Sequence, residues 1–95
     1  MLHVLRGPNA GSTYLLDQDQ TSIGRHPDSS IFLDDITVSR RHSSVDNAGD
    51  GTFLIRDAGS LNGTYVNRER VESRSLADGD EVQVGRFHLV FHVGE

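Results

Sequence analysis

Short apolar runs recur about every eight to twelve residues along the chain, and Gly, Asn, Asp and Pro separate them. This spacing is typical of an all-β sandwich, because short strands alternate with tight turns that these four residue types favour. No stretch shows a convincing helical period. We therefore predict an all-β fold with strands at residues 2–6, 12–16, 21–24, 31–33, 42–46, 52–57, 64–67, 71, 81–84 and 87–93.

The clearest strand is predicted at residues 87–93, where consecutive side chains alternate between two faces. One face carries only large apolar side chains and is assigned to the core: Phe87, Leu89, Phe91 and Val93. Turns are predicted where Gly, Asn and Asp gather, at residues 7–9, 47–51 and 78–80.

Composition and charge limit the functional class. The chain has 95 residues, 35% of them hydrophobic, which suits one small domain spanning residues 1–95. Its formal charge is -5 and its nine basic residues are all arginine, without the broad basic face expected of a nucleic-acid binding protein. Only Arg25, Arg40 and Arg41 are clustered, and a small basic spot in an acidic protein suits one localised anion.

Cysteine is absent, which excludes disulfides and thiolate metal sites and fits a reducing compartment. Residues 1–8 contain no apolar segment of signal-peptide type, and no run is long enough to cross a bilayer. We therefore expect a soluble, cytoplasmic protein without a membrane partner. Nothing in the pattern demands a dimer, so a monomer is expected.

Three separated motifs carry the candidate chemistry: Gly24-Arg25, Ser39-Arg40-Arg41-His42 and Asn62-Gly63. Arginine and serine side chains donate hydrogen bonds to a phosphate dianion, and an asparagine amide can both donate to and accept from the backbone of an extended peptide. All three motifs are predicted on loops that a sandwich can gather at one end. The set therefore indicates a protein that binds phosphorylated protein.

Each motif taken alone also has an ordinary explanation. A solvated arginine at a turn accounts for Arg25, a solvated charge run accounts for residues 39–41, and a type I′ hairpin accounts for Asn62-Gly63. His42 is expected to be structural, with its imidazole buried under the loop and bonded to backbone. Only the joint occurrence of the motifs favours a binding site.

Other constellations do not support catalysis or metal binding. Ser39 and His42 lack a nucleophile elbow and a clear third member of a hydrolase triad. The Cα atoms of His88 and His92 would lie about 13 Å apart on one strand, too far to share a metal. Residues 46–51 start like a calcium loop, but Ala48 occupies a ligand position and no helices flank it. We expect no enzymatic activity, no cofactor and no metal.

The three motifs resemble those of the forkhead-associated (FHA) domain, a phosphothreonine-peptide binding module. The resemblance extends over essentially the whole chain. It implies a β-sandwich of two sheets and about eleven strands, whose loops at one end bind the peptide.

The resemblance also implies a role for each matching residue. Arg25 and Ser39 would bind the phosphate, and Arg40 would add a second cationic contact to phosphate or peptide. Asn62 would hold the peptide backbone beside the phosphothreonine.

Structural support of this site would come from Gly24, His42 and Gly63. Many FHA domains carry Ser or Thr immediately before the asparagine, whereas this chain has Leu61 there. A phosphate contact at this point would therefore come from the backbone N–H of Leu61 or from Ser60.

Longer matches, at residues 6–11, 24–29, 39–42 and 59–67, resemble small actinobacterial FHA regulators of the GarA and OdhI type. That resemblance implies a Ser/Thr protein kinase and 2-oxoglutarate or glutamate dehydrogenase as partners. In those regulators a phosphorylated N-terminal tail folds back onto the FHA face. This chain begins at its first predicted strand, so we expect either an isolated domain or an FHA module of another protein.

Two functions stay open on these residues. The first is phosphothreonine-dependent protein binding that regulates 2-oxoglutarate and glutamate metabolism downstream of a kinase. The alternative is phosphate-independent docking onto a metabolic enzyme through the same loops, which would inhibit that enzyme.

Overall fold

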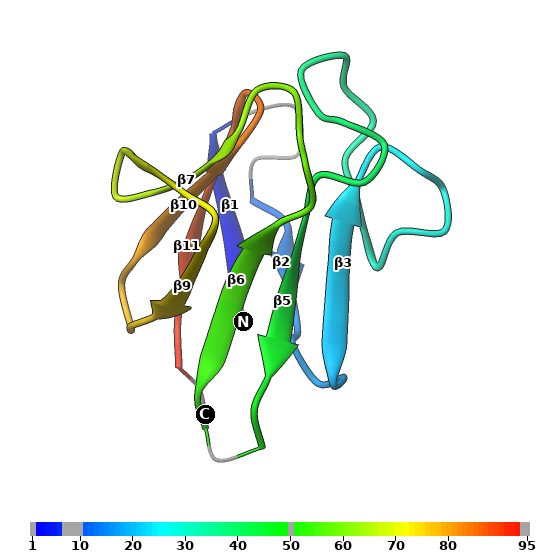
Figure 1. Ribbon diagram of the computed structural model, residues 1–95. Coiled ribbons are helices and arrows are strands. Elements are labelled where there is room, and N and C mark those ends of the chain that lie inside the picture. The colour runs from blue at the N-terminus through cyan, green and yellow to red at the C-terminus, as the bar shows by residue number, and fades with distance from the viewer. Residues whose placement is uncertain (1, 7–10, 50, 94–95) are drawn as a thin grey trace.

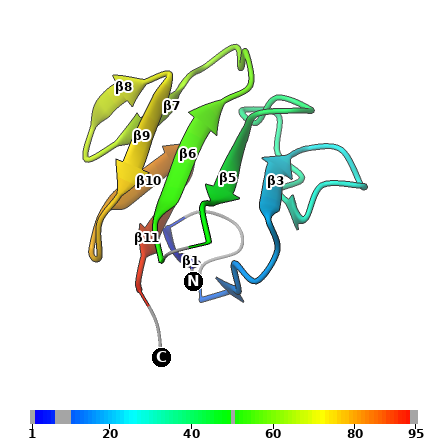
Figure 2. The same cartoon turned by 60° about the horizontal axis from the view of Figure 1, so that its bottom comes forward.

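A computed structural model describes residues 2–6, 11–49 and 51–93. These residues form eleven strands in two sheets that lie face to face, and they contain no helix (Figure 1). The all-β prediction is therefore confirmed. Figure 2 shows β3 (Gln20–Gly24), β5 (Ser43–Asn47) and β6 (Phe53–Asp57) in one layer with β1 (Leu2–Arg6), β10 (Glu81–Val84) and β11 (Phe87–Phe91) in the other.

The first sheet has six strands in the order β2-β1-β11-β10-β7-β8. The first and last strands of the chain pair antiparallel within it, with Leu2 opposite Phe91. Its strands are β1 (Leu2–Arg6), β2 (Thr13–Tyr14), β7 (Thr64–Val66), β8 (Glu69–Val71), β10 (Glu81–Val84) and β11 (Phe87–Phe91).

The second sheet has five strands in the order β4-β3-β5-β6-β9. The short pair β3 and β4 is parallel, and the other pairs in this sheet are antiparallel. Its strands are β3 (Gln20–Gly24), β4 (Ile31–Phe32), β5 (Ser43–Asn47), β6 (Phe53–Asp57) and β9 (Ser73–Leu76).

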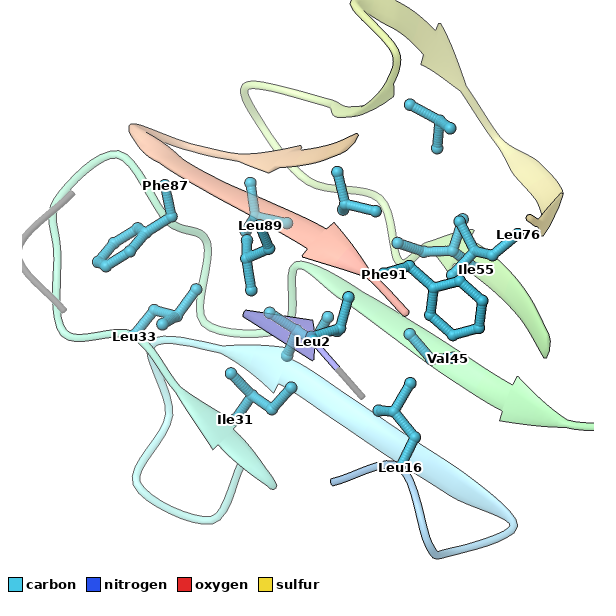
Figure 3. Close-up of a cluster of buried hydrophobic side chains, with 14 of the residues drawn as sticks. Leu2, Leu16, Ile31, Leu33, Val45, Ile55, Leu76, Phe87, Leu89 and Phe91 are labelled. Atoms are coloured by element: carbon cyan, nitrogen blue, oxygen red, sulfur yellow. The ribbon is translucent and has the colours of Figure 1, made fainter. Parts of the chain in front are cut away.

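The core lies between the two sheets and is built from alternate residues of their strands (Figure 3). Phe87, Leu89 and Phe91 of β11 are almost fully buried, as their alternation predicts. The ring of Phe53 on β6 meets Phe91 edge-on, with centroids 5.4 Å apart, so the aromatic contact joins the sheets. The assignment of Val93 to the core was wrong, because β11 ends at Phe91 and Val93 is 59% exposed.

The sequence pattern did not predict strand β9. Ser73, Arg74 and Ser75 are all exposed, and only Leu76 is buried. Its strand conformation comes from backbone pairing with the edge of β6, where Phe53 lies opposite Leu76. An edge strand with one buried side chain has no apolar alternation to reveal it.

The hairpin explanation of Asn62-Gly63 was wrong. These residues connect β6 in one sheet to β7 in the other, so they do not close a hairpin. The two-residue hairpin lies one strand later, at Asn67-Arg68, between β7 and β8. Both residues have positive φ, 51° and 70°, as a type I′ turn requires.

The remaining turn predictions fared differently. The turn at residues 78–80 is confirmed, with Gly79 at a φ of 90°. The turn predicted at residues 7–9 lies outside the described residues, as does Asp50 within the turn at residues 47–51.

Truncation of the core should cost far more than truncation of an exposed apolar residue. Leu89 is fully buried, so Leu89→Ala should lower the free energy of unfolding by about 3 kcal/mol through lost transfer energy and a cavity. Leu15 is 64% exposed, and Leu15→Ala should change it by less than about 0.5 kcal/mol. Urea denaturation of both variants measures the difference. Equal losses would contradict the assigned core.

Candidate functional site

The loops that carry the three motifs meet at one end of the sandwich. Strands β3 and β6 both run toward this end, and the loop that leads into β5 lies there between the loops that follow them (Figure 1). Backbone hydrogen bonds tie the loops across the sequence: the N–H of Arg25 donates to the carbonyl of Ser39 at 3.0 Å, and that of His26 donates to the carbonyl of Arg40 at 3.3 Å. The predicted meeting of the loops is thus present in the structure.

Gly24 permits this close approach of two backbones. A Cβ atom at this position would overlap the carbonyl oxygen of Arg40. Gly24 is not among the glycines with positive φ, so its contribution is the absence of a side chain and not a special backbone conformation.

Arg25 is exposed, yet its guanidinium is held in place. The Nε–H donates to the backbone carbonyl of Val38 at 3.0 Å. This bond uses one edge of the guanidinium and leaves the two terminal nitrogens to donate elsewhere. Arginine in this arrangement suits a bidentate contact with an oxyanion.

Ser39 and Leu61 join the two principal loops of the site, which are the loop at residues 33–42 between β4 and β5 and the loop at residues 58–63 between β6 and β7. The backbone N–H of Leu61 donates to the hydroxyl oxygen of Ser39 at 3.0 Å. The hydroxyl therefore acts as an acceptor here, and its own proton remains to be donated. The N–H of Leu61 is engaged within the protein, while its side chain is 85% exposed.

His42 is fully buried beneath these loops and bonded to backbone at both ring nitrogens. Nδ1 accepts a hydrogen bond from the N–H of Ser39 at 3.1 Å, and Nε2 lies 2.8 Å from the carbonyl oxygen of Gly63. Because a carbonyl only accepts, this pair of contacts requires the neutral Nε2–H tautomer. Burial lowers the pKa of His42, although the Gly63 carbonyl and the charge of Asp57 oppose the shift.

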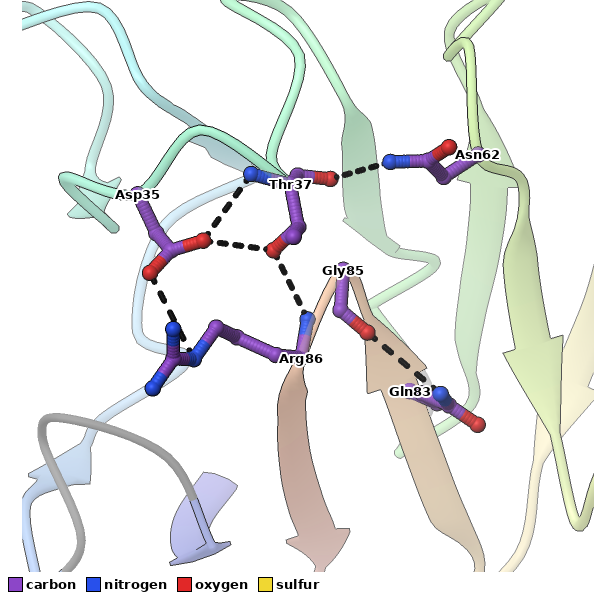
Figure 4. A network of polar contacts seen from close by, with 6 residues as sticks. All are labelled: Asp35, Thr37, Asn62, Gln83, Gly85 and Arg86. Atoms are coloured by element: carbon purple, nitrogen blue, oxygen red, sulfur yellow. Dashed lines mark hydrogen bonds and ion pairs between the residues drawn. The ribbon is translucent and has the colours of Figure 1, made fainter.

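Asn62 is exposed, and its side-chain amide already makes one hydrogen bond within the protein. Its amide Nδ2 donates to the carbonyl of Thr37 at 2.8 Å, which leaves one N–H and the amide oxygen available. Thr37 is fixed by its neighbour Asp35, whose carboxylate accepts from the N–H and the hydroxyl of Thr37 (Figure 4). The Thr37 hydroxyl in turn accepts from the N–H of Arg86 in the β10–β11 hairpin.

An ion pair between Arg86 and Asp35 adds to these hydrogen bonds around Thr37. The guanidinium of Arg86 lies 3.5 Å from Asp35, and the hydrogen bonds from the Thr37 hydroxyl and N–H lower the pKa of the Asp35 carboxyl. A Cβ at Gly85 would fall 2.5 Å from the Thr37 hydroxyl oxygen, so the hairpin turn packs directly on Thr37. Asn62 is thereby positioned by two loops and a hairpin.

Ser60 has an interior position. It is only 7% exposed, donates its hydroxyl to Asp57 and accepts the N–H of Gly63 at 3.0 Å. The predicted contact between this hydroxyl and a phosphate therefore conflicts with its surroundings, since both of its hydrogen-bonding roles are filled inside the loop. The structure gives Ser60 a part in shaping the loop instead.

Asp57 organises the same loop. Its carboxylate accepts from the N–H of Gly59 and of Ser60 and from the hydroxyl of Thr64. Burial alone would raise the pKa of Asp57, but the hydrogen bond from the Ser60 hydroxyl, together with these other bonds, lowers it below the ordinary value. Sequence analysis missed Asp57 and Asp35. The available signal was an Asp followed two or three residues later by a group that its side chain can cap, as in an Asx turn.

Among the described residues, the three clustered arginines have no ion-pair partner. Within the described residues no carboxylate lies within ion-pair distance of Arg25, Arg40 or Arg41, and Arg68 and Arg70 are also without one. Other arginines are paired: Arg56 with Asp46, Arg74 with Glu69 and Arg86 with Asp35. The site end of this acidic protein therefore offers positive charge that no carboxylate in the described part of the chain pairs with.

Ser39 and His42 do not form a nucleophile and base pair. The imidazole accepts from the backbone N–H of Ser39, while the hydroxyl of Ser39 meets the N–H of Leu61. No group of three potential metal ligands occurs among the described residues. Nor does that part of the chain contain a helix long and apolar enough to cross a membrane.

Acidification should weaken the fold through His42. Its folded pKa lies below the ordinary 6.5, so in that interval the unfolded chain binds a proton that the folded chain does not. The stability that this group contributes is complete above 6.5 and is lost as the pH falls through the folded pKa. Urea denaturation from about pH 8 to 5 measures the loss, and ¹⁵N NMR at pH 6.5, the ordinary pKa, should show more than half of the His42 ring in the neutral Nε2–H form. His26→Gln should retain this dependence; a His42 ring that is mostly charged at pH 6.5 would contradict it.

Comparison with known proteins places the chain in a family. It is 66% identical over 94 residues to the glycogen accumulation regulator GarA of Mycolicibacterium smegmatis, covering 99% of this chain and 59% of the relative. It is 62% identical over 91 residues to an oxoglutarate dehydrogenase inhibitor of Corynebacterium jeikeium, covering 96% and 62%. The chain thus spans less than two thirds of the length of these relatives.

Solved structures give the same result. An FHA domain studied for phosphothreonine-dependent interactions superposes with a TM-score of 0.89 at 34% identity, covering 99% of this chain and 95% of the other. EmbR of Mycobacterium tuberculosis in complex with a low affinity phosphopeptide gives 0.89 at 33% identity, covering 98% and 24%. Residues 21–85 match the FHA domain family. This chain therefore belongs to the FHA domain family.

Proposed function

We propose that this domain binds proteins through phosphothreonine, using Arg25, Ser39 and Asn62 as its principal contacts. The observation that supports the proposal is the convergence of these side chains at one end, each held by one internal bond with hydrogen-bonding capacity left over. Arg25 and Ser39 offer donors to the phosphate. Asn62 offers both a donor and an acceptor to the peptide backbone.

Arg40 and the loop at residues 60–63 complete the proposed site. Arg40 is exposed and unpaired within the described residues, so it is free to contact phosphate or peptide. Leu61 would contribute its backbone N–H only after exchanging its bond to Ser39. Gly24, His42 and Gly63 support the site by close packing and backbone hydrogen bonds.

The energetics favour reversible capture. A phosphorylated threonine carries about -1.5 to -2 charge and three strong acceptor oxygens. Charge-assisted hydrogen bonds contribute about 1.5–3 kcal/mol each, and the ordering of a flexible peptide offsets part of this. We expect micromolar dissociation constants, which correspond to a binding free energy of about -8 kcal/mol. This affinity suits a signalling contact and not a permanent assembly.

The names of the relatives extend the proposal to a pathway. Curated relatives are called glycogen accumulation regulator and oxoglutarate dehydrogenase inhibitor. We propose that this domain acts as a non-catalytic module that regulates 2-oxoglutarate or glutamate metabolism under control of a Ser/Thr kinase. The partner proteins would be the kinase and a dehydrogenase.

Arg25→Ala should abolish phosphopeptide binding and leave the fold intact. The bidentate contact of an arginine with phosphate is not replaced by neighbouring groups, so we expect at least about a hundredfold loss of affinity. Calorimetry with a phosphothreonine peptide measures this, and thermal unfolding verifies the fold. Arg68→Ala removes an equally unpaired arginine from the β7–β8 turn and should bind normally. Unchanged affinity in Arg25→Ala would refute the assignment.

A second candidate function is phosphate-independent docking onto a dehydrogenase. Two large apolar side chains on the site loops favour it: Ile36 is 92% exposed and Leu61 is 85% exposed. Exposed aliphatic residues beside a polar site suit burial against the surface of a folded partner.

The double variant Ile36→Ser and Leu61→Ser separates the two functions. If docking is independent of phosphate, inhibition of unphosphorylated 2-oxoglutarate dehydrogenase should weaken by at least about tenfold, because buried apolar contacts dominate such interfaces. Leu15→Ser changes an exposed leucine outside the site loops and should inhibit normally. Enzyme assays with and without kinase treatment provide the readout. Binding of the dehydrogenase only after kinase treatment would exclude this second function.

A further inference from the structure

We propose a second anion-binding subsite around Arg41, on the outer face of the five-stranded sheet beside the phosphothreonine site. It would take another anionic side chain of the same peptide, either a second phosphate or a carboxylate. The inference rests on the proposed function, because the phosphothreonine contact would hold the peptide nearby.

The subsite is a surface cavity of about 200 Å³ between β3, β5 and the loop after β3. Most of the residues that line it have polar side chains, and none of them is a carboxylate, although the chain carries fourteen acidic residues. The polar side chains on its wall that the proposal uses are Ser22, Ser29, Arg41 and Ser44.

Three other surface cavities have a different character. One is lined in part by Asp17, and another by Asp57 and Glu72. A third contains Arg86, but that guanidinium already lies 3.5 Å from the carboxylate of Asp35. Among these four cavities of the described residues, the cavity at Arg41 alone combines an arginine without a carboxylate partner with a wall free of acidic residues, so its electrostatics favour an anion.

The hydroxyls around Arg41 have donors to spare. Within the described part of the chain, the hydroxyls of Ser29 and Ser44 make no hydrogen bond. The hydroxyl of Ser22 accepts a hydrogen bond from the N–H of Ser30 at 2.9 Å. It donates only a long hydrogen bond of 3.5 Å to the hydroxyl oxygen of Ser30. Together with the five N–H donors of a guanidinium, these groups can satisfy a tetrahedral or planar oxyanion.

Chain geometry links this cavity to the first site. Arg41 is two residues from Ser39, so their Cα atoms are at most about 7 Å apart. An extended peptide advances about 3.4 Å per residue. An anionic side chain about two to four residues from the phosphothreonine could therefore reach Arg41 while the phosphothreonine stays bound.

Calorimetry with a series of peptides tests the proposal on the intact domain. Each peptide carries one phosphothreonine and, at the second, third or fourth residue to either side, alanine, glutamate or a second phosphothreonine. The proteins are wild type, Arg41→Gln and the matched control Arg68→Gln, which removes the same charge from the β7–β8 turn. Wild type and Arg68→Gln should gain about threefold to fivefold in affinity at one or more positions, as expected for an exposed charge pair.

Arg41→Gln should lose this gain while binding the singly phosphorylated peptide normally. A gain with phosphate but not with glutamate would identify the second anion as phosphate, and a gain with both would identify a general acidic preference. The proposal is overturned if no position increases affinity, if Arg41→Gln keeps the gain, or if Arg68→Gln loses it equally.

A second measurement separates this proposal from the first site. In NMR titrations with phosphoserine alone, the amide signals of Ser29, Arg41 and Ser44 should shift in wild type and in Arg25→Ala, but not in Arg41→Gln. Shifts confined to the residues around Arg25 and Ser39 would overturn the second subsite and leave the first in place. Failure of the phosphothreonine peptide to bind wild type would instead count against the proposed function.

Discussion

One buried, neutral imidazole connects the parts of the molecule on which binding would depend. His42 accepts from the backbone of Ser39 and donates to that of Gly63, and so bridges the two principal loops. Its own backbone is bonded to Ile23, the next-to-last residue of β3, and to Ala58, the first residue after β6. Because every one of these contacts is with main chain, the loop arrangement depends on ring geometry more than on the side chains that the loops display.

The three principal side chains of the site share one physical property: the protein satisfies only part of the hydrogen-bonding capacity of each. Arg25, Ser39 and Asn62 spend one hydrogen bond on the protein and keep the remainder. Side chains fixed in this way lose little further conformational entropy when a ligand arrives. The loops behind them are held by two carboxylates, Asp35 and Asp57, which accept hydrogen bonds from Thr37 and Thr64.

The sequence allowed us to predict the strands that show apolar alternation and the loops that carry the motifs. It did not allow us to predict features that depend on pairing between distant parts of the chain. Strand β11 could be predicted because the large apolar residues Phe87, Leu89 and Phe91 alternate with half-buried residues. β9 could not, since its strand conformation depends on the edge of β6. At the site, the meeting of distant loops followed from the order of motifs. The inward hydroxyl of Ser60 did not, because its partners Asp57 and Gly63 converge only in the folded loop.

The pairing of Leu2 with Phe91 has a consequence for how the domain can be tethered. Phe87 adjoins the β10–β11 hairpin at the binding end, so Phe91, four residues further along β11, lies toward the opposite end with Leu2 beside it. A segment joined to Leu2 would start there and travel a distance comparable to the longest dimension, 34 Å, before meeting Arg25. A fully stretched chain needs about ten residues for that path. Spacer length thus decides which covalently attached sequences can compete with a free partner, and at what effective concentration.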